Sequence, residues 1–312
     1  MRLEDITRVS VVGGGTMGFG IGINFALWGY PTIIHDLNDQ ILQKTYVRIQ
    51  KALKIFVDEG LINQQRADES FKRFTLTTDL AKAANADFIT EAIVERLCDK
   101  QELFNKLDKI CPLQTIIASN TSTLLVSDIA KDVKRQDKVL LTHYFDPPYI
   151  IPGVEVANGS GTSDETFNIT YDLMKKVKKV PIKVLKETSG YLINSIQFAF
   201  WRTALQLWAE GVASAEDIEL GIRASCGFRN PTIGPFGHMD MSGGFKWPKD
   251  AVLAMMEKAL SGLSEEIKNK VAKRFLSGKP WIIDPDSFNE LVELRDREYA
   301  RRLKDLYWGK SD

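Results

Sequence analysis

The side chain best suited to move a proton is that of His143, one of three histidines in the 312-residue chain. It follows an apolar run, Val139 to Thr142, that predicts a strand, and it precedes Tyr-Phe-Asp-Pro-Pro, which cannot continue as regular structure. In open α/β sheets, ligands bind beyond the carboxyl ends of the strands. An imidazole at that place can titrate near neutral pH and act as a general acid or base. His35 and His238 lie in settings that favour packing or capping.

Two further apolar runs also end in polar side chains. Residues 86–92 and residues 115–119 each predict a short strand, and each leads to groups that can form hydrogen bonds. The candidates are Glu91 and Glu95 after the first run, and Asn120 and Ser122 after the second. We expect these strand ends to converge with His143 on one edge of a sheet.

The N-terminal segment has the order of elements that binds a dinucleotide. A β-branched strand, Val9 to Val12, runs into a Gly-x-Gly-x-x-Gly turn and a helical stretch, and a second strand, Thr32 to His35, ends on an acid. The glycines permit a tight turn, close approach to a pyrophosphate and close helix packing, and the helix N-terminus attracts phosphates. The candidate cofactor-binding residues are Gly13, Gly15, Thr16, Met17, Gly18 and Asp36. A carboxylate accepts hydrogen bonds from ribose hydroxyls and repels a 2′-phosphate, which favours NAD over NADP.

Composition and charge exclude several classes of protein. The 41 basic and 41 acidic residues give no global field that would recruit nucleic acid or an anionic membrane, so the expected partner is a small-molecule substrate. The N-terminus is charged where a signal peptide has an apolar core, and the apolar stretch at 193–208 is interrupted by polar residues. Three scattered cysteines lack metal-ligand spacing, so we expect no metal and a reducing, cytoplasmic setting.

The order of the predicted elements indicates an α/β fold of the Rossmann type. Up to Lys186, short strands alternate with helical stretches, which is typical of a doubly wound, mostly parallel sheet, here with a helical insertion near residues 41–73. From Gly190 through Leu306 we expect helices only. The sequence therefore predicts an NAD-binding domain at residues 1–187 and an all-helical substrate or dimerisation domain at residues 188–312.

The motifs resemble those of the L-3-hydroxyacyl-CoA dehydrogenase family. The similarity covers about the first 240 residues and rests on Val-Gly-Gly-Gly-Thr-Met-Gly, Thr-Glu-Ala-Ile-Val-Glu, Ala-Ser-Asn-Thr-Ser-Thr-Leu, His-Tyr-Phe-Asp-Pro, Ser-Gly-Tyr-Leu-Ile-Asn and Gly-Pro-Phe. It implies that Glu155, twelve residues after His143, orients the imidazole and stabilises its charged form. It also implies that Ser122 and Asn194 hydrogen-bond the substrate near its reacting oxygen. Within these motifs, Glu91, Glu95 and Asn120 are the further cofactor-binding candidates.

The resemblance implies an NAD-dependent homodimeric oxidoreductase that interconverts 3-hydroxyacyl and 3-ketoacyl groups in fatty acid metabolism. A short-chain 3-hydroxyacyl-CoA, such as 3-hydroxybutyryl-CoA, is the first candidate substrate. A free 3-hydroxy acid or alcohol (L-gulonate or carnitine) is the alternative, because the tail from Leu294 resembles the lambda-crystallin, L-gulonate 3-dehydrogenase and carnitine dehydrogenase branch. A third possibility is a non-catalytic, crystallin-like NAD-binding protein, against which the intact site residues argue. A lysine-dependent β-hydroxyacid dehydrogenase is excluded, since residues 191–197 contain no lysine.

Three features depart from the family pattern. Asp146 stands where asparagine is usual, Cys98 replaces a lysine common near the cofactor, and a Gly-Phe-Tyr type of C-terminal signature is missing. No Arg or Lys occurs in residues 119–122 or 143–155, which favours a thioester, neutral at its reacting end, over a free carboxylate. A carboxylate at position 146 would tolerate a cationic substrate group. The basic residues of the insertion that could meet CoA phosphates, or merely form a solvated helix face, are Lys51, Lys54, Lys72 and Arg73.

Overall fold

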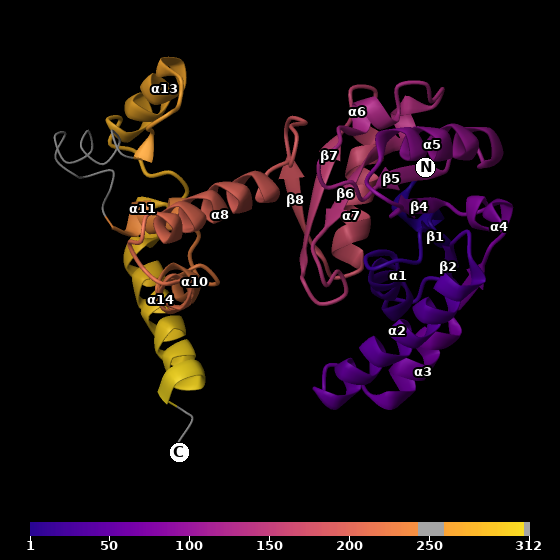
Figure 1. Ribbon diagram of the computed structural model, residues 1–312, viewed down its shortest axis with the longest axis horizontal. Coiled ribbons are helices and arrows are strands. Elements are labelled where there is room, and N and C mark those ends of the chain that lie inside the picture. The colour runs from indigo at the N-terminus through magenta and orange to yellow at the C-terminus, as the bar shows by residue number, and fades with distance from the viewer. Residues whose placement is uncertain (243–258, 309–312) are drawn as a thin grey trace. The chain divides into compact units, whose positions relative to one another are not determined.

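Two compact units make up the chain (Figure 1). The computed structural model describes residues 1–242 and 259–308, and contacts within the chain separate Met1–Phe200 from Trp201–Asp312. All the site residues expected from the sequence lie in the first unit. Among the described residues, no helix has both the length and the apolar character that crossing a membrane requires.

The first unit is built on one eight-stranded sheet within the part of the chain that the structure describes. Its strands are β1 (Val9–Val12), β2 (Thr32–His35), β3 (Phe74–Thr77), β4 (Phe88–Glu91), β5 (Ile116–Ser119), β6 (Val139–Tyr144), β7 (Gly153–Asn158) and β8 (Val180–Val184). The order across the sheet is β3-β2-β1-β4-β5-β6-β7-β8, and every neighbouring pair is parallel except β6 and β7. The predicted fold class, a doubly wound and mostly parallel sheet followed by a helical domain, is confirmed.

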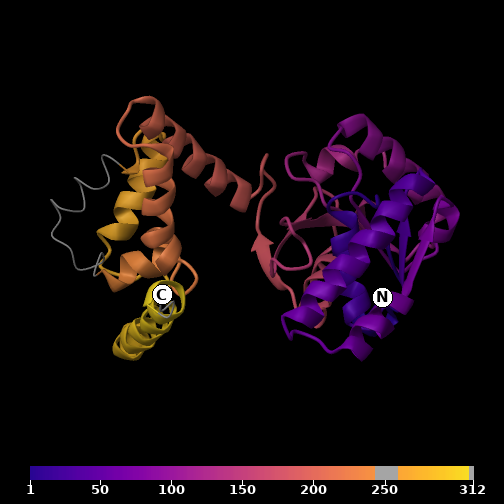
Figure 2. The same cartoon turned by 60° about the horizontal axis from the view of Figure 1, so that its bottom comes forward.

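Helices cover both faces of the sheet (Figures 1 and 2). The helices of the first unit are α1 (Gly18–Leu27), α2 (Asp39–Asp58), α3 (Gln64–Lys72), α4 (Leu80–Ala84), α5 (Leu97–Ile110), α6 (Val126–Ile129) and α7 (Asp164–Lys176). Helix α8 (Ile193–Ala209) begins in this unit. Helices α2 and α3 occupy the region where the sequence predicts a helical insertion, and Arg66 and Arg73 donate hydrogen bonds to the last carbonyls of α1. Cations at a helix C-terminus stabilise its dipole.

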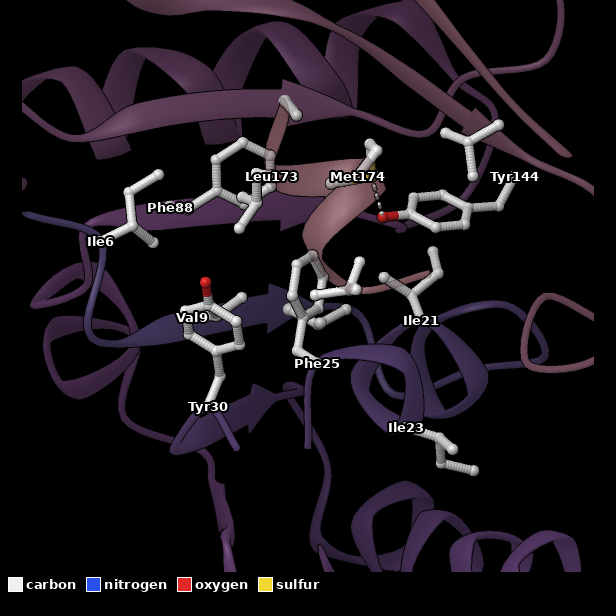
Figure 3. Close-up of a cluster of buried hydrophobic side chains, with 14 of the residues drawn as sticks. Ile6, Val9, Ile21, Ile23, Phe25, Tyr30, Phe88, Tyr144, Leu173 and Met174 are labelled. Carbon is white, nitrogen blue, oxygen red and sulfur yellow. Dashed lines mark hydrogen bonds between the residues drawn. The ribbon is translucent and has the colours of Figure 1, made fainter. Parts of the chain in front are cut away.

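Two layers of apolar core hold the sheet between the helices. One contains side chains from α1, α2 and α7, and the other contains side chains from α4, α5 and α6. Figure 3 shows the first layer, where Val9 and Phe88 of the strands pack with Leu173 and Met174 of α7. The hydroxyl of Tyr144, at the end of β6, donates a hydrogen bond to Met174 Sδ at 3.2 Å. Burying each large apolar side chain contributes roughly 1.5–3 kcal/mol, which makes this sheet a rigid frame for the groups at its edge.

The described part of the second unit is helical, as the sequence predicts from Gly190 onward. Its helices are α9 (Ala215–Ala224), α10 (Cys226–Arg229), α11 (Pro235–Met241), α13 (Glu265–Phe275) and α14 (Phe288–Leu303). The predicted helical content of residues 243–258 lies outside the described residues. A buried carboxylate, Asp240, accepts hydrogen bonds from the backbone N–H groups of residues 281–283 and holds that segment against α11.

Candidate active site

His143 and Glu155 face each other across the antiparallel strands β6 and β7. The strand register places the two residues directly opposite each other, and His143 Nδ1 lies 2.7 Å from Glu155 Oε2. The sequence predicts a strand that ends at Thr142, but β6 continues to Tyr144, so His143 lies inside the strand. The continuation has a physical reason, because directly opposed residues of an antiparallel pair are close enough for their side chains to interact.

The Glu155 carboxylate also holds the beginning of α8. Its Oε1 atom accepts hydrogen bonds from the backbone N–H groups of Leu192, at 2.9 Å, and Ile193, at 2.8 Å. The side chain is completely buried, and that of His143 is only 4% exposed. Because the carboxylate accepts from three N–H groups, the hydrogen-bond pattern assigns a hydrogen to His143 Nδ1 and leaves Nε2 as the nitrogen that can take up a proton.

Ser122 and Asn194 lie side by side at the same cluster. Asn194, in the first turn of α8, donates a hydrogen bond from Nδ2 to the backbone oxygen of Ser122 at 3.3 Å. Asn194 directly follows the two backbone N–H groups that Glu155 binds. Hydrogen bonds therefore connect the imidazole, the buried carboxylate, the start of α8 and the loop after β5 into one network that includes Ser122 and Asn194.

Glu95 fixes the backbone of this loop. Its Oε1 atom accepts hydrogen bonds from the hydroxyl of Thr121 at 2.6 Å and from the N–H groups of Ser122 at 2.8 Å and Thr123 at 2.9 Å. Burial alone would raise the pKa of Glu95, but these hydrogen bonds and the positive charge of Lys100 outweigh it and lower the pKa to about 2. The carboxylate is therefore ionised at neutral pH and keeps Ser122 in place.

Lys100 is a member of this cluster that the motifs do not reveal. It is buried on α5, where its Nζ lies 2.5 Å from Glu91 Oε1 and 3.3 Å from Glu95 Oε2. Glu91 is buried too, and its second oxygen accepts a hydrogen bond from the Ser119 hydroxyl at 2.6 Å. The signal in the sequence is a lysine at the head of the apolar stripe of α5, since the stripe residues Leu103, Phe104 and Leu107 follow it at helical spacing.

Asn120 joins β5 to the strand that carries His143. Its Oδ1 atom accepts a hydrogen bond from the backbone N–H of Tyr144 at 2.8 Å. The backbone N–H of Asn120 donates to the backbone oxygen of Glu91. Glu91 and Asn120 are both expected to bind the cofactor, but many of their hydrogen-bonding atoms are engaged by other groups of the protein. Their observed contacts position the edge of the sheet.

The glycine-rich turn after β1 has the geometry that a dinucleotide needs. Gly13 has a φ of +110°, and a Cβ added to Gly18 would lie 1.7 Å from the backbone oxygen of Gly13, so the protein itself demands both glycines. Around Gly15, by contrast, a Cβ would meet nothing within 4 Å. Thr16 and Met17 lead into α1, whose N-cap residue, Met17, makes no side-chain hydrogen bond to the first turn. Open space and free N–H groups at a helix N-terminus suit a pyrophosphate.

Asp36 lies directly after β2 and next to this turn. Its Oδ2 atom accepts a hydrogen bond from the N–H of Gly14 at 2.8 Å, and the side chain is half-buried. No hydrogen bond from a described residue reaches Oδ1, so this oxygen can accept from a ribose hydroxyl. The residues present therefore fit the adenosine diphosphate portion of NAD.

The other histidines and basic residues belong to other surroundings. His35 is buried in β2, and burial lowers its pKa. His238 lies on α11 with its Nε2 3.0 Å from Arg229, and burial together with that cation lowers its pKa. In the insertion, Lys54 pairs with the exposed Asp58 on its own helix.

Comparisons with known proteins agree with this geometry. Residues 8–188 match the family model of the 3-hydroxyacyl-CoA dehydrogenase NAD-binding domain, and residues 190–276 match that of the C-terminal domain of the same family. L-carnitine dehydrogenase of Bacillus cereus is 31% identical over 99% of this chain and 95% of its own length. The 3-hydroxybutyryl-CoA dehydrogenase of Clostridioides difficile is 33% identical over 80% of this chain and 85% of its own length. Among solved structures, that of (S)-3-hydroxybutyryl-CoA dehydrogenase from Ralstonia eutropha has a TM-score of 0.68 and 28% identity over 87% of this chain and 94% of its own.

The fold, the glycine-rich turn and the histidine–carboxylate pair define an NAD-dependent oxidoreductase that acts on a CH–OH group. More particularly, the chain belongs to the 3-hydroxyacyl-CoA dehydrogenase family.

Proposed function

We propose that His143 is the general acid–base residue of a reaction that interconverts a secondary alcohol and a ketone. In the oxidation, Nε2 takes the proton of the substrate hydroxyl, and Glu155 stabilises the resulting imidazolium through Nδ1. NAD, when bound, supplies the site that accepts the hydride. Ser122 and Asn194 hold the reacting oxygen. The observation that carries this proposal is the buried His143–Glu155 contact of 2.7 Å, joined by hydrogen bonds to the loop that carries Ser122.

We propose Gly13, Gly15, Thr16, Met17, Gly18 and Asp36 as the residues that contact the cofactor. The open space at Gly15 and the available oxygen of Asp36 support this assignment. The remaining three candidates act indirectly, by positioning the loop and strand that border the site. They are Glu91, Glu95 and Asn120, whose carboxylates and amide bind that loop and strand.

As first substrate we propose a short-chain 3-hydroxyacyl-CoA. Its thioester is neutral at the reacting end, and the segments 119–122 and 143–155 contain no cation to hold a carboxylate. The buried cation near the loop, Lys100, is already paired with Glu91 and Glu95. A free 3-hydroxy acid such as L-gulonate would leave its charge without a partner from these segments, and the same holds for the carboxylate of L-carnitine.

L-carnitine is the second candidate, and two observations favour it. The similarity to L-carnitine dehydrogenase spans 99% of the chain, whereas the family models end at residue 276. Asp146, three residues after His143, is exposed and can attract the quaternary ammonium of such a substrate. In the insertion, Lys54 and Arg73 are engaged by Asp58 and by the end of α1, which reduces the positive charge available to CoA phosphates.

The experiment that decides between them compares kinetics with acetoacetyl-CoA, free acetoacetate, L-gulonate and L-carnitine for the wild type and Asp146→Asn. Preference for acetoacetyl-CoA, unchanged by the substitution, supports the CoA substrate. Preference for L-carnitine that falls in Asp146→Asn supports the alternative. Preference for L-gulonate would contradict the charge argument, and the absence of any NAD-coupled turnover with the whole set would contradict the proposed substrates.

The protein is proposed to act as a cytoplasmic homodimer. Helix α8 has no buried side chain among its residues, and Ile196, Leu205 and Trp208 are each more than half exposed. A second copy could cover such an apolar face. Cys98, Cys111 and Cys226 are free thiols, which agrees with a reducing compartment. Sedimentation velocity on the wild type and on Leu205→Glu tests the dimer.

A further inference from the structure

A threonine on α2, which belongs to none of the sequence motifs, contacts the glycine-rich turn. Thr45 lies 31 residues after Gly14 and is completely buried, and its Oγ1 lies 2.7 Å from the backbone oxygen of Gly14. The same hydroxyl lies 2.9 Å from the oxygen of Ile41, one turn earlier in the helix. A hydroxyl donates one hydrogen at a time, and the shorter distance is the one to the turn.

Gly14 is therefore held on both sides. Its N–H donates to Asp36 Oδ2 at 2.8 Å, and its carbonyl accepts from Thr45. The fit is close, because a Cβ on Gly14 would lie 2.7 Å from Thr45 Oγ1 and 3.6 Å from Asp36 Oδ2. One residue of the turn thus connects the acid after β2 with the interior of α2.

The consequence concerns the next residue, Gly15. Apart from its two chain neighbours, nothing in the protein lies within 4 Å of the place where its Cβ would be, so the space on that side of Gly15 is open to a ligand. Its position depends on Gly14 and Gly13, which precede it. A binding loop that is already in its bound position loses less conformational freedom when the ligand arrives, and this raises affinity.

We propose that Thr45 is a positioning residue for NAD, which sets the glycine-rich turn through the Gly14 carbonyl without touching the cofactor. The inference rests on the proposed role of that turn in binding the pyrophosphate. Because Thr45 is remote from His143 in the hydrogen-bond network, its loss should weaken NAD binding and leave the chemical step unchanged.

The test uses three substitutions of Thr45 and one matched control. Thr45→Ala removes the hydroxyl without adding bulk, Thr45→Val replaces it by a methyl group of the same shape, and Thr45→Ser restores it. The control is Thr170→Val on α7, a buried threonine whose Oγ1 has no hydrogen-bond partner among the described residues. NADH binding is measured by fluorescence titration, competition with ADP-ribose reports the pyrophosphate contact, and steady-state kinetics separate the KM for NAD from kcat.

Loss of one hydrogen bond predicts that Thr45→Ala and Thr45→Val bind NADH and ADP-ribose about 3- to 10-fold more weakly, with kcat within about twofold of the wild type. Thr45→Ser and Thr170→Val should bind like the wild type. Wild-type affinity in Thr45→Ala would overturn the proposal, and so would an equal loss in Thr45→Ser, since size rather than the hydroxyl would then matter. Failure of the wild type itself to bind NADH would contradict the proposed function, and the inference with it.

Discussion

Replacing Glu155 by glutamine tests whether this carboxylate sets the chemistry of His143. The carboxylate accepts from His143 Nδ1 with one oxygen and from the N–H groups of Leu192 and Ile193 with the other. A glutamine amide has only one accepting oxygen, and its nitrogen donates. The side chain must therefore choose which of its two sets of neighbours the oxygen will face.

The energies decide the choice. If the oxygen turned to His143, two buried backbone N–H groups would lose their acceptor, at a cost of about 1–3 kcal/mol each. The oxygen should instead stay with α8, so that the amide nitrogen donates to Nδ1 and the ring hydrogen moves to Nε2. In that tautomer the imidazole cannot accept the substrate proton. We expect Glu155→Gln to lower kcat for alcohol oxidation by roughly 10²- to 10⁴-fold, the usual contribution of general acid–base catalysis.

The assay is NAD reduction with the alcohol form of the best substrate (3-hydroxybutyryl-CoA where acetoacetyl-CoA is preferred), alongside NADH binding and urea unfolding. Because α8 keeps its acceptor, the free energy of unfolding should change by no more than about 1 kcal/mol. Glu165→Gln, which removes an exposed carboxylate, is the control and should keep the wild-type kcat. In the double variant with His143→Ala, the glutamine should cost little more than the alanine alone, because Glu155 acts through the imidazole. A folded Glu155→Gln enzyme within tenfold of wild-type kcat, or fully additive losses, would refute the reasoning.

Three further outcomes follow from the same structure. Asp36→Ala should reduce the preference for NAD over NADP, measured as the ratio of the two kcat/KM values. Equal kcat/KM values for the two cofactors in the wild type would contradict the role of Asp36 in cofactor selection. Lys100→Met should lower the free energy of unfolding in urea by about 3–5 kcal/mol, because it leaves the buried Glu91 charge uncompensated, whereas Lys54→Met at an exposed pair should cost less than about 1 kcal/mol. Burial lowers the pKa of Lys179 from 10.5 to about 8, so between these pH values the unfolded chain binds the additional proton. The contribution of Lys179 to stability should therefore rise with pH by up to about 3 kcal/mol, and comparing unfolding of the wild type and Lys179→Met across that range checks it.

Local patterns predict the strands of the first unit well. β1 and β2 begin and end at the predicted residues, because β-branched and apolar runs between turn residues leave little choice. The end of β6 differs from the prediction. Its last two residues are held by pairing with β7 and by a hydrogen bond to Asn120. Neither contact can be predicted from the sequence of residues 139–144 alone.

The site is less visible in the sequence, because its members meet only in three dimensions. The spacing of His143 and Glu155 does not by itself reveal that they oppose each other, since the contact depends on the antiparallel pair β6–β7 within an otherwise parallel sheet. Only the resemblance to a family names both residues together. Lys100 and Thr45 lie in helical segments whose patterns predict a helix but not the partner on the far side. Tertiary contacts of this kind cannot be read from periodicity.

The proposed acid–base role of His143 is tested most directly by one comparison of purified wild type and His143→Ala. NADH binding and turnover are measured together. Turnover is followed as NADH oxidation with acetoacetyl-CoA and as NAD reduction with L-carnitine. We expect the variant to bind NADH like the wild type and to lose roughly 10²- to 10⁴-fold of its turnover with whichever substrate the wild type prefers. A variant that binds NADH and turns over at nearly the wild-type rate would contradict the assignment of His143 as the acid–base residue.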